Sequence, residues 1–309
     1  MSASSHKRKS KHRHPVNEKN LLVATFLNAL IAIVELAGGI LSGSLALFSD
    51  ALHNLSDAFA TFIAYIAILI GKRGANQKKT FGYKRIEILA ALINAVILIV
   101  VSAFLLKEAW QRWQEPEPIN SSIMLVVAMI GLLANVYALI ILQKDAGKSI
   151  NVKAAYIHLI GDSLSSVVVI LGGLAIALFQ VYWIDPLITL FISLYIIRSG
   201  YMILKEAVNI LMQSAPEHLD LGAIKTQVEL RPEVLNIHHM HAWMLTDSEI
   251  HMEAHVELNK DLPLSQVKLI QGDIERLLKK EHKIQHVTLQ FEYLADHAPS
   301  LIHTKNPHD

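Results

Sequence analysis

Two His-x-x-x-Asp motifs lie within long apolar runs of the chain, and their residue types are those that bind transition metals. The first motif is His53 with Asp57, and the second is His158 with Asp162. Residues i and i+4 of a helix share one face, so each motif directs an imidazole and a carboxylate to the same place. Two such helices facing each other would offer two nitrogens and two carboxylates, a tetrahedral set suited to Zn²⁺.

The composition limits what else could hold such a metal. The 309 residues are 52% hydrophobic and only 18% charged, with a formal net charge of +1, and this charge content is low for a soluble protein. The chain has no cysteine, which excludes disulfides and thiolate ligands. Ionisable side chains in a bilayer cost about 2.5–3.5 kcal/mol each on insertion scales, so the motif residues are candidates for function.

Membrane helices must position these motifs. A helix needs about 20 residues to cross roughly 30 Å of hydrocarbon, and six apolar runs are long enough. The expected fold class is therefore an α-helical membrane protein with six transmembrane helices. They are predicted at 21–41, 45–71, 86–107, 121–143, 152–179 and 186–206.

Lysine and arginine in the short loops predict how the chain is oriented. Basic residues gather in 1–20, 72–85 and 144–153, whereas the alternate loops carry few or none. Positive residues concentrate on the cytoplasmic side of a membrane, so both termini are expected in the cytoplasm. A bacterial plasma (inner) membrane is the working hypothesis for the location.

This orientation places the two motifs at one depth. At 1.5 Å per residue, Asp57 lies roughly 18 Å from the outer end of its helix and Asp162 roughly 15 Å from the inner end of its helix. Both carboxylates therefore fall near the middle of a core of roughly 30 Å. A lone buried histidine often serves only in hydrogen bonding between helices. Two motifs at matching depth favour one shared metal site instead.

Other polar residues in the apolar runs are candidates for supporting roles. Asp50 lies three residues before His53, on nearly the same face. It could orient a ligand, line the water path or lie in the outer mouth, and the supporting roles are favoured. For Glu35, which shares a face with Asn28, a functional role and a packing role both remain open. Asn94 and Asn135 are predicted to form hydrogen bonds between helices.

From about residue 214 the composition becomes that of a small soluble α+β domain. Its expected order is α-β-β-α-β, with strong apolar periodicity in the second helix and alternation in the last strand. The segments are helix 219–230, strands 235–245 and 249–258, helix 263–280 and strand 284–293. This domain is also rich in histidine.

With these features together, the chain resembles the cation diffusion facilitator family, in its zinc-transporting branch. The resemblance rests on the six runs, the two His-x-x-x-Asp motifs, the basic segment 80–85 and the C-terminal domain. It implies that His53, Asp57, His158 and Asp162 form the transport site. Histidine at the first position of both motifs implies Zn²⁺ as substrate, with Cd²⁺ or Co²⁺ as companions.

The resemblance also bears on the C-terminal domain. It implies a copper-chaperone-like fold that forms a homodimer in the cytoplasm. By family position, His238, His255 and Glu292 are candidates for a cytoplasmic metal site, where Zn²⁺ could be regulatory. Gln290 stands where some relatives have histidine, which argues against a complete binuclear site.

We therefore divide the chain into four parts. They are a disordered basic cytoplasmic tail at 1–20, a transport domain at 21–210, a metal-binding and dimerisation domain at 211–295, and a disordered tail at 296–309.

The function that we expect is secondary active export of Zn²⁺ from the cytoplasm in exchange for protons, without enzymatic activity. The chain has no G-x-x-x-x-G-K-[ST] motif for ATP binding. The partners are metal ions, protons, the bilayer and a second copy of the chain, with no nucleic acid. One alternative is a membrane-anchored metal sensor. A weaker one is an intramembrane zinc enzyme, because Asn54 and Leu159 stand where an H-E-x-x-H motif would have glutamate.

Overall fold

The computed structural model describes residues 18–71, 74–143, 150–294 and 300–301. Most of the two predicted tails, and most of the basic loop before 150, lie outside the described residues. The chain divides into two units, one formed by 1–63 with 94–202 and the other by 64–93 with 203–309.

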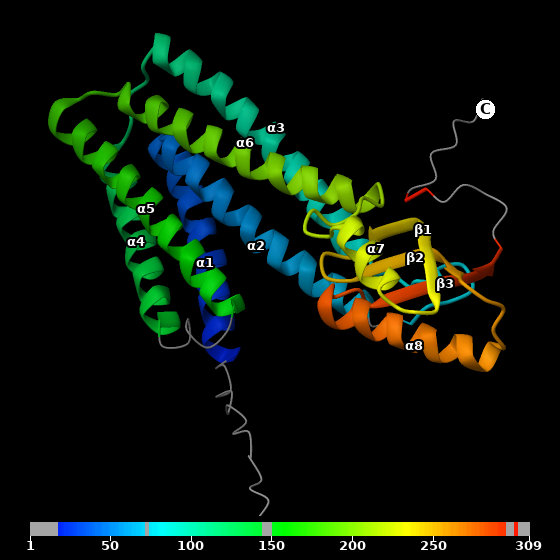
Figure 1. Ribbon diagram of the computed structural model, residues 1–309. Coiled ribbons are helices and arrows are strands. Elements are labelled where there is room, and N and C mark those ends of the chain that lie inside the picture. Colours follow the sequence, from blue (N-terminus) through cyan, green and yellow to red (C-terminus); the bar gives the residue numbers. More distant parts are fainter. Residues whose placement is uncertain (1–17, 72–73, 144–149, 295–299, 302–309) are drawn as a thin grey trace, which may run out of the picture. The chain divides into compact units, whose positions relative to one another are not determined.

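Six long helices make up the N-terminal two thirds of the chain (Figure 1). In the first unit, α4 packs against both α1 and α5. The ends of α3 and α6 lie beyond the predicted 107 and 206, because hydropathy marks where a run stops being apolar and not where the helix ends. The helices are α1 (Glu18–Ser42), α2 (Leu45–Gly71), α3 (Ile86–Gln114), α4 (Ser121–Gln143), α5 (Ile150–Phe179) and α6 (Ile184–Leu211).

Four of these helices are long and apolar enough to cross a membrane. They are α3, α4, α6 and the Ala155–Phe179 part of α5. Within the described residues, α1 contributes a shorter apolar helix, Phe26–Ser42, and α2 is not among the four. The structure thus supports four clear spans of the six that were predicted.

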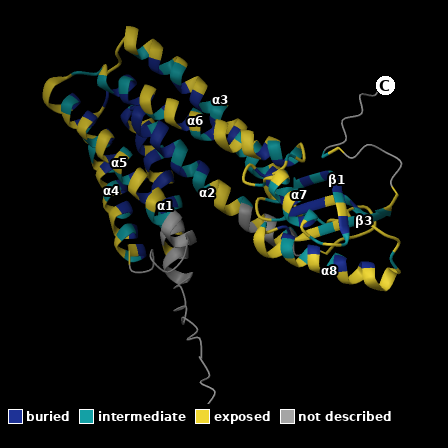
Figure 2. Cartoon of the chain, viewed as in Figure 1, coloured by how far each residue is buried: buried dark blue, intermediate teal, exposed yellow. Residues whose placement is uncertain are grey.

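The beginning of α2, which precedes the first motif, is the most buried part of the first unit (Figure 2). Ala46 and Leu47 are fully buried and belong to a core that includes Met124 of α4 and Val169 of α5. Gly39 lets α1 approach this segment, since a Cβ there would lie 2.8 Å from the Cα of Phe48. Close packing therefore fixes the first turns of α2 against the helices around it.

The second unit contains a three-stranded sheet with the expected α-β-β-α-β order. β1 and β2 are antiparallel and β2 and β3 are parallel, with strand order β1-β2-β3. A parallel pair needs a long crossover, and α8 supplies it. The elements are α7 (Leu221–Glu229), β1 (Val234–Met244), β2 (Ile250–Leu258), α8 (Leu264–Glu281) and β3 (His286–Tyr293).

Two residues of the predicted C-terminal tail lie against β1. The register of β1 shifts between His238 and His241, and His239 has a φ of 49°. There the N–H groups of His239 and Met240 donate to the carbonyls of Ser300 and Leu301. The tail is anchored at this point because Leu301 also packs against the domain core.

Candidate metal centres

Asp185 of α6 fixes the start of the helix that carries His53 and Asp57. Its carboxylate accepts hydrogen bonds from the N–H groups of Leu45 (2.8 Å) and Ala46 (3.3 Å) and from the Ser44 hydroxyl. The first N–H groups of a helix have no partner within it, so this buried carboxylate satisfies them from another helix. Sequence reasoning missed this contact, because Ser44 and Asp185 are 141 positions apart.

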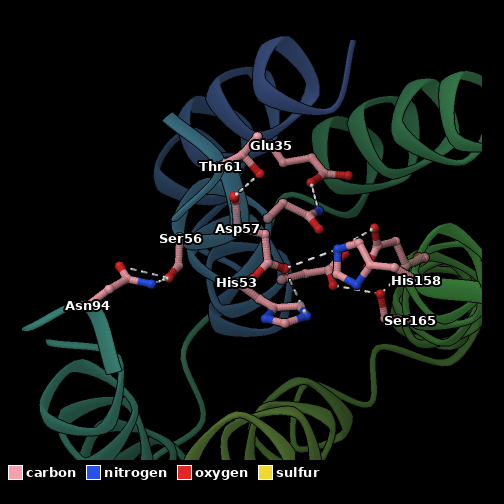
Figure 3. Close-up of polar contacts among 11 residues, drawn as sticks. Glu35, His53, Ser56, Asp57, Thr61, Asn94, His158 and Ser165 are labelled. Atoms are coloured by element: carbon pink, nitrogen blue, oxygen red, sulfur yellow. Dashed lines mark hydrogen bonds and ion pairs between the residues drawn. The ribbon is translucent and has the colours of Figure 1, made fainter. Parts of the chain in front are cut away.

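The four predicted transport-site residues meet between α2 and α5 (Figure 3). His53 Nε2 and Asp57 Oδ2 are 3.5 Å apart, and His158 Nε2 lies 3.2 Å from the same Asp57 oxygen. His158 Nε2 is also 3.5 Å from Asp162 Oδ2. The ring centroids of His53 and His158 are 6.0 Å apart. The contacts therefore form a chain in which imidazoles and carboxylates alternate.

The donor atoms of these residues fit a bound cation. Asp57 Oδ2, Asp162 Oδ2 and His53 Nδ1 are buried and make no hydrogen bond among the described residues. Buried polar atoms are normally hydrogen-bonded, so unsatisfied carboxylate oxygens beside two imidazoles are suited to metal binding. The side chain of Asp162 is only 2% exposed, whereas that of His158 is 41% exposed. The group of four residues is therefore most accessible at His158 and closed at Asp162.

A cavity of about 890 Å³ gives access to this group. Its polar lining includes Asp50, His53, His158 and Asp162, and its remaining walls are mainly apolar residues of α5 and α6. An apolar wall with a few convergent polar groups is typical of a binding site for a small solute.

Asp50 lies beside the four residues, as its spacing predicts. It is 1% exposed, and its Oδ1 accepts a hydrogen bond of 2.7 Å from the Ser165 hydroxyl of α5. Asp50 therefore links the two helices that carry the motifs.

Two further polar contacts connect α2 to its neighbours. The Asn54 amide donates to Glu35 Oε2 on α1 at 2.8 Å, and Ser56 and Asn94 exchange hydrogen bonds of 2.9 and 3.2 Å between α2 and α3 (Figure 3). Asn94 has the interhelical role that was predicted for it, whereas the side-chain atoms of Asn135, which had the same prediction, have no hydrogen-bond partner among the described residues. Sequence analysis did not single out Asn54 and Ser56, although a polar residue inside an apolar run is itself a signal.

The three candidate ligands of the C-terminal domain converge on one point. His255 Nδ1 is 2.7 Å from Glu292 Oε1, and His238 Nε2 is 3.5 Å from Glu292 Oε2. Among the described residues this is the one group whose three ligand atoms all lie within 4.8 Å of one another. The sheet produces it, because His238 pairs with His255 across β1 and β2 and Glu292 lies on β3. Gln290 donates to Glu292 Oε1 at 2.8 Å.

Comparison with known proteins gives matches over nearly the whole chain. Residues 21–212 match the family described as the cation efflux transmembrane domain, and residues 216–294 match the cation efflux protein cytoplasmic domain.

Several bacterial relatives are similar over most of their length. The zinc transporter ZitB of Pectobacterium atrosepticum is 38% identical over 304 residues, which cover 96% of this chain and 92% of the relative. A cadmium, cobalt and zinc/H⁺-K⁺ antiporter of Bacillus subtilis is 38% identical over 284 residues, 91% of each chain. The zinc transporter ZitB of Escherichia coli is 36% identical over 301 residues, covering 96% and 95% of the two chains.

Proposed function

Because the chain belongs to the cation efflux family, the cation diffusion facilitators, we propose that it exports Zn²⁺ from the cytoplasm in exchange for protons. It is an integral membrane transporter and not an enzyme. The observation that carries the proposal is the alternating contact of two imidazoles with two carboxylates between α2 and α5. The names of the relatives support Cd²⁺ and Co²⁺ as further substrates.

The proposed transport site consists of His53, Asp57, His158 and Asp162, with Asp50 in support. Two imidazoles and two carboxylates match the ligand number and types of tetrahedral Zn²⁺. Imidazole nitrogens favour Zn²⁺ and its neighbours among the transition metals over Mg²⁺ or Mn²⁺, which prefer oxygen. The Oδ2 atoms of Asp57 and Asp162, which contact the imidazoles and no other described polar group, support the same assignment.

The same contacts suggest how protons replace the metal. Imidazole binds a metal only when it is neutral, so protons and Zn²⁺ compete for the site. Once protonated, His158 could donate toward Asp57 or Asp162, both of which lie within 3.5 Å of its Nε2. A lower external pH would therefore expel the metal, and the near-neutral cytoplasm would favour reloading.

We further propose six membrane helices, formed by α1 to α6, with both termini in the cytoplasm of a bacterial cell and the protein in its plasma membrane. The basic residues of the loops support this orientation. The matched ranges 21–212 and 216–294 support a membrane domain near 21–210 and a cytoplasmic domain near 211–295. Alternate exposure of the site would come from rocking of helix groups.

The C-terminal domain is proposed to form a homodimer of copper-chaperone-like subunits and to bind regulatory Zn²⁺. Its match to the family's cytoplasmic domain and its α-β-β-α-β order support the first part. The close grouping of His238, His255 and Glu292 supports the second.

Zinc uptake into vesicles that contain the purified protein tests the proposed function. With an inward-directed metal gradient and an outward-directed proton gradient, uptake should be fast, and it should slow when the proton gradient is removed. His53→Ala and Asp162→Ala should each lower the rate at least tenfold, because each removes one of four ligands. If the wild-type uptake rate does not depend on the proton gradient, the protein does not exchange protons for zinc.

A matched control comes from an exposed histidine of the cytoplasmic domain. His218 lies outside both metal centres and is exposed, so His218→Ala should transport at the wild-type rate. If His53→Ala transports as well as His218→Ala, the assignment of the transport site is wrong. A membrane-anchored sensor would show no transport in any of these proteins.

A further inference from the structure

Glu35 is a buried carboxyl group that the proposed metal site does not use. It lies on α1, has no exposed surface, and receives one hydrogen bond among the described residues, from the Asn54 amide to Oε2 at 2.8 Å (Figure 3). Its other oxygen, Oε1, has no hydrogen-bond partner there. Position 131 of α4 is glycine, and a Cβ there would overlap this oxygen. The carboxyl group is thus enclosed by α1, α2 and α4.

Two carboxylates among the described residues act on the charge of Glu35. They are the carboxylates of Asp50 on α2 and Asp162 on α5, while α4 presents Gly131 toward it. No described Lys, Arg or His forms an ion pair with Glu35. An isolated buried carboxylate is far more costly than its neutral form, above all inside a membrane. A proton is the simplest means of neutralising it.

Glu35 is also connected to the metal-binding helix. Asn54, its hydrogen-bond partner, directly follows His53 in sequence. Because a divalent ion between α2 and α5 would bring positive charge near Glu35, it would favour the ionised carboxylate. Binding of the metal and binding of a proton to Glu35 should therefore oppose each other.

We propose that Glu35 carries one of the exchanged protons, being protonated while the transport site is empty and ionised while it holds metal. This inference rests on the proposed proton-coupled export. When the metal binds, the O–H bond of the carboxylic acid breaks and the proton leaves to water, with no other bond changed. When the metal leaves, Glu35 takes up a proton again.

Two buried amides lie on the same faces of α1 and α4 as Glu35 and Gly131. Asn135 is four residues after Gly131 and therefore shares its face of α4, and Asn28 is seven residues before Glu35 on the same face of α1. Both are buried with side-chain atoms that have no hydrogen-bond partner among the described residues. They could pass the proton, with water, toward the N-terminal end of α1, which the proposed topology places in the cytoplasm.

The test counts protons released when zinc binds to the full-length protein in detergent. Zinc is titrated calorimetrically near neutral pH in two buffers that differ in ionisation enthalpy, in a His255→Ala background that removes the cytoplasmic site. The Glu35→Gln protein should release about one proton fewer per bound metal than the parent protein with Glu35. Its zinc affinity should change less than tenfold. Release of the same number of protons by both proteins would overturn the inference.

Glu35→Gln also separates proton binding from a structural role. Glutamine keeps an acceptor for Asn54. If Glu35 only holds α1 against α2, Glu35→Gln should change neither the folding of the protein nor the number of protons released. Asn54→Ala removes that contact and reports its structural value through thermal unfolding. Glu108→Gln, at an ion pair with Arg112 on α3, serves as the matched control and should leave the proton count unchanged.

Different results would contradict the proton exchange and the role of Glu35. If zinc binding to the parent protein releases no proton and its transport ignores a pH gradient, the proposed exchange itself is wrong. If the parent protein exchanges protons and Glu35→Gln does so with the same count, only the role of Glu35 is wrong.

Discussion

Asp50 lies beside the four proposed metal ligands and is hydrogen-bonded to the helix that carries two of them. Its Oδ1 accepts a hydrogen bond from Ser165, and its buried Oδ2 has no partner among the described residues. Ser165 follows Asp162 by three residues on α5, so the hydrogen bond joins the two motif helices beside their ligands. The negative charge of Asp50 would also favour a cation there.

Asp50→Asn should weaken zinc binding at the transport site while leaving the fold intact. Asparagine keeps an acceptor for Ser165 but loses the charge, and removal of groups that orient metal ligands typically costs 10–100-fold in affinity. The measurement is a zinc titration of the purified protein in the His255→Ala background. Ser165→Ala, which keeps the charge, should lose less affinity, and an unchanged affinity in Asp50→Asn would remove Asp50 from the site.

Spacing along the chain could predict part of this site and not the rest. The i,i+4 motifs and the position of Asp50 follow from helical periodicity, because each relation lies within one helix. Ser165 and Asn54 could not be assigned in this way. Their partners are 115 and 19 positions away, and only the packing of α5 or α1 against α2 identifies them.

At the scale of elements, the contact between Asp185 and the start of α2 decides where the first motif lies. Asp185 is fully buried and accepts hydrogen bonds from two N–H groups and one hydroxyl of 44–46. Arg112 of α3 donates to the carbonyl of Gly43 just before them. Because His53 lies about two turns further on, a shift of this end would displace the ligands.

Asp185→Ala should therefore impair both stability and transport. It leaves buried donors unpaired, at about 1–3 kcal/mol for each donor, and removes the contact that holds α2 to α6. The midpoint of thermal unfolding in detergent and the rate of zinc uptake into vesicles should both fall. Asp185→Asn retains one acceptor oxygen, so its unfolding midpoint and uptake rate should lie between those of the wild-type and Asp185→Ala proteins. Wild-type values for Asp185→Ala would show that core packing alone holds α2.

The elements themselves were predictable to different degrees. Hydropathy located the helices because a membrane-crossing run is long, yet it placed the ends of α3 and α6 at 107 and 206 instead of Gln114 and Leu211. Periodicity gave the order of the C-terminal elements. It could not show that β3 is parallel to β2, or that Ser300 and Leu301 pair with β1, since these pairings depend on contacts between distant segments.

At the scale of the whole molecule, the second unit joins the segment before α3 to the sheet. Lys84 Nζ lies 2.8 Å from Glu249 Oε1, which is 3.2 Å from His251 Nε2, and the ring of Phe81 contacts the ring of His251 at 5.6 Å. Because Lys84 lies two residues before α3 begins at Ile86, these contacts connect the sheet to a membrane helix.

The protonation of Glu249 sets the pH range of this connection. Partial burial raises the pKa of its carboxyl, but hydrogen bonds from Lys84 and His251 and their charges outweigh it, so the net pKa is lowered. Because the pKa is lower in the folded state, the contact stabilises the fold at pH values above the pKa of the unfolded state, which is about 4.3 for glutamate. That stabilisation is lost only as the pH falls through the folded pKa. The connection should therefore persist from neutral pH down to about pH 4.3, the unfolded value, and weaken only below it.

Hydrogen exchange of the segment 76–85 measures this contact directly. At any pH between about 5.5 and 8, Glu249→Gln should speed exchange of the segment by at most about fivefold, because a partly exposed ion pair contributes no more than about 1 kcal/mol. High salt should reduce the difference by screening. Glu281→Gln, at the exposed pair with Lys280, should have no effect on this segment. If it speeds exchange as much as Glu249→Gln does, the effect comes from general charge and not from the contact. A specific effect would mean that the C-terminal domain restrains the start of α3 throughout the physiological pH range.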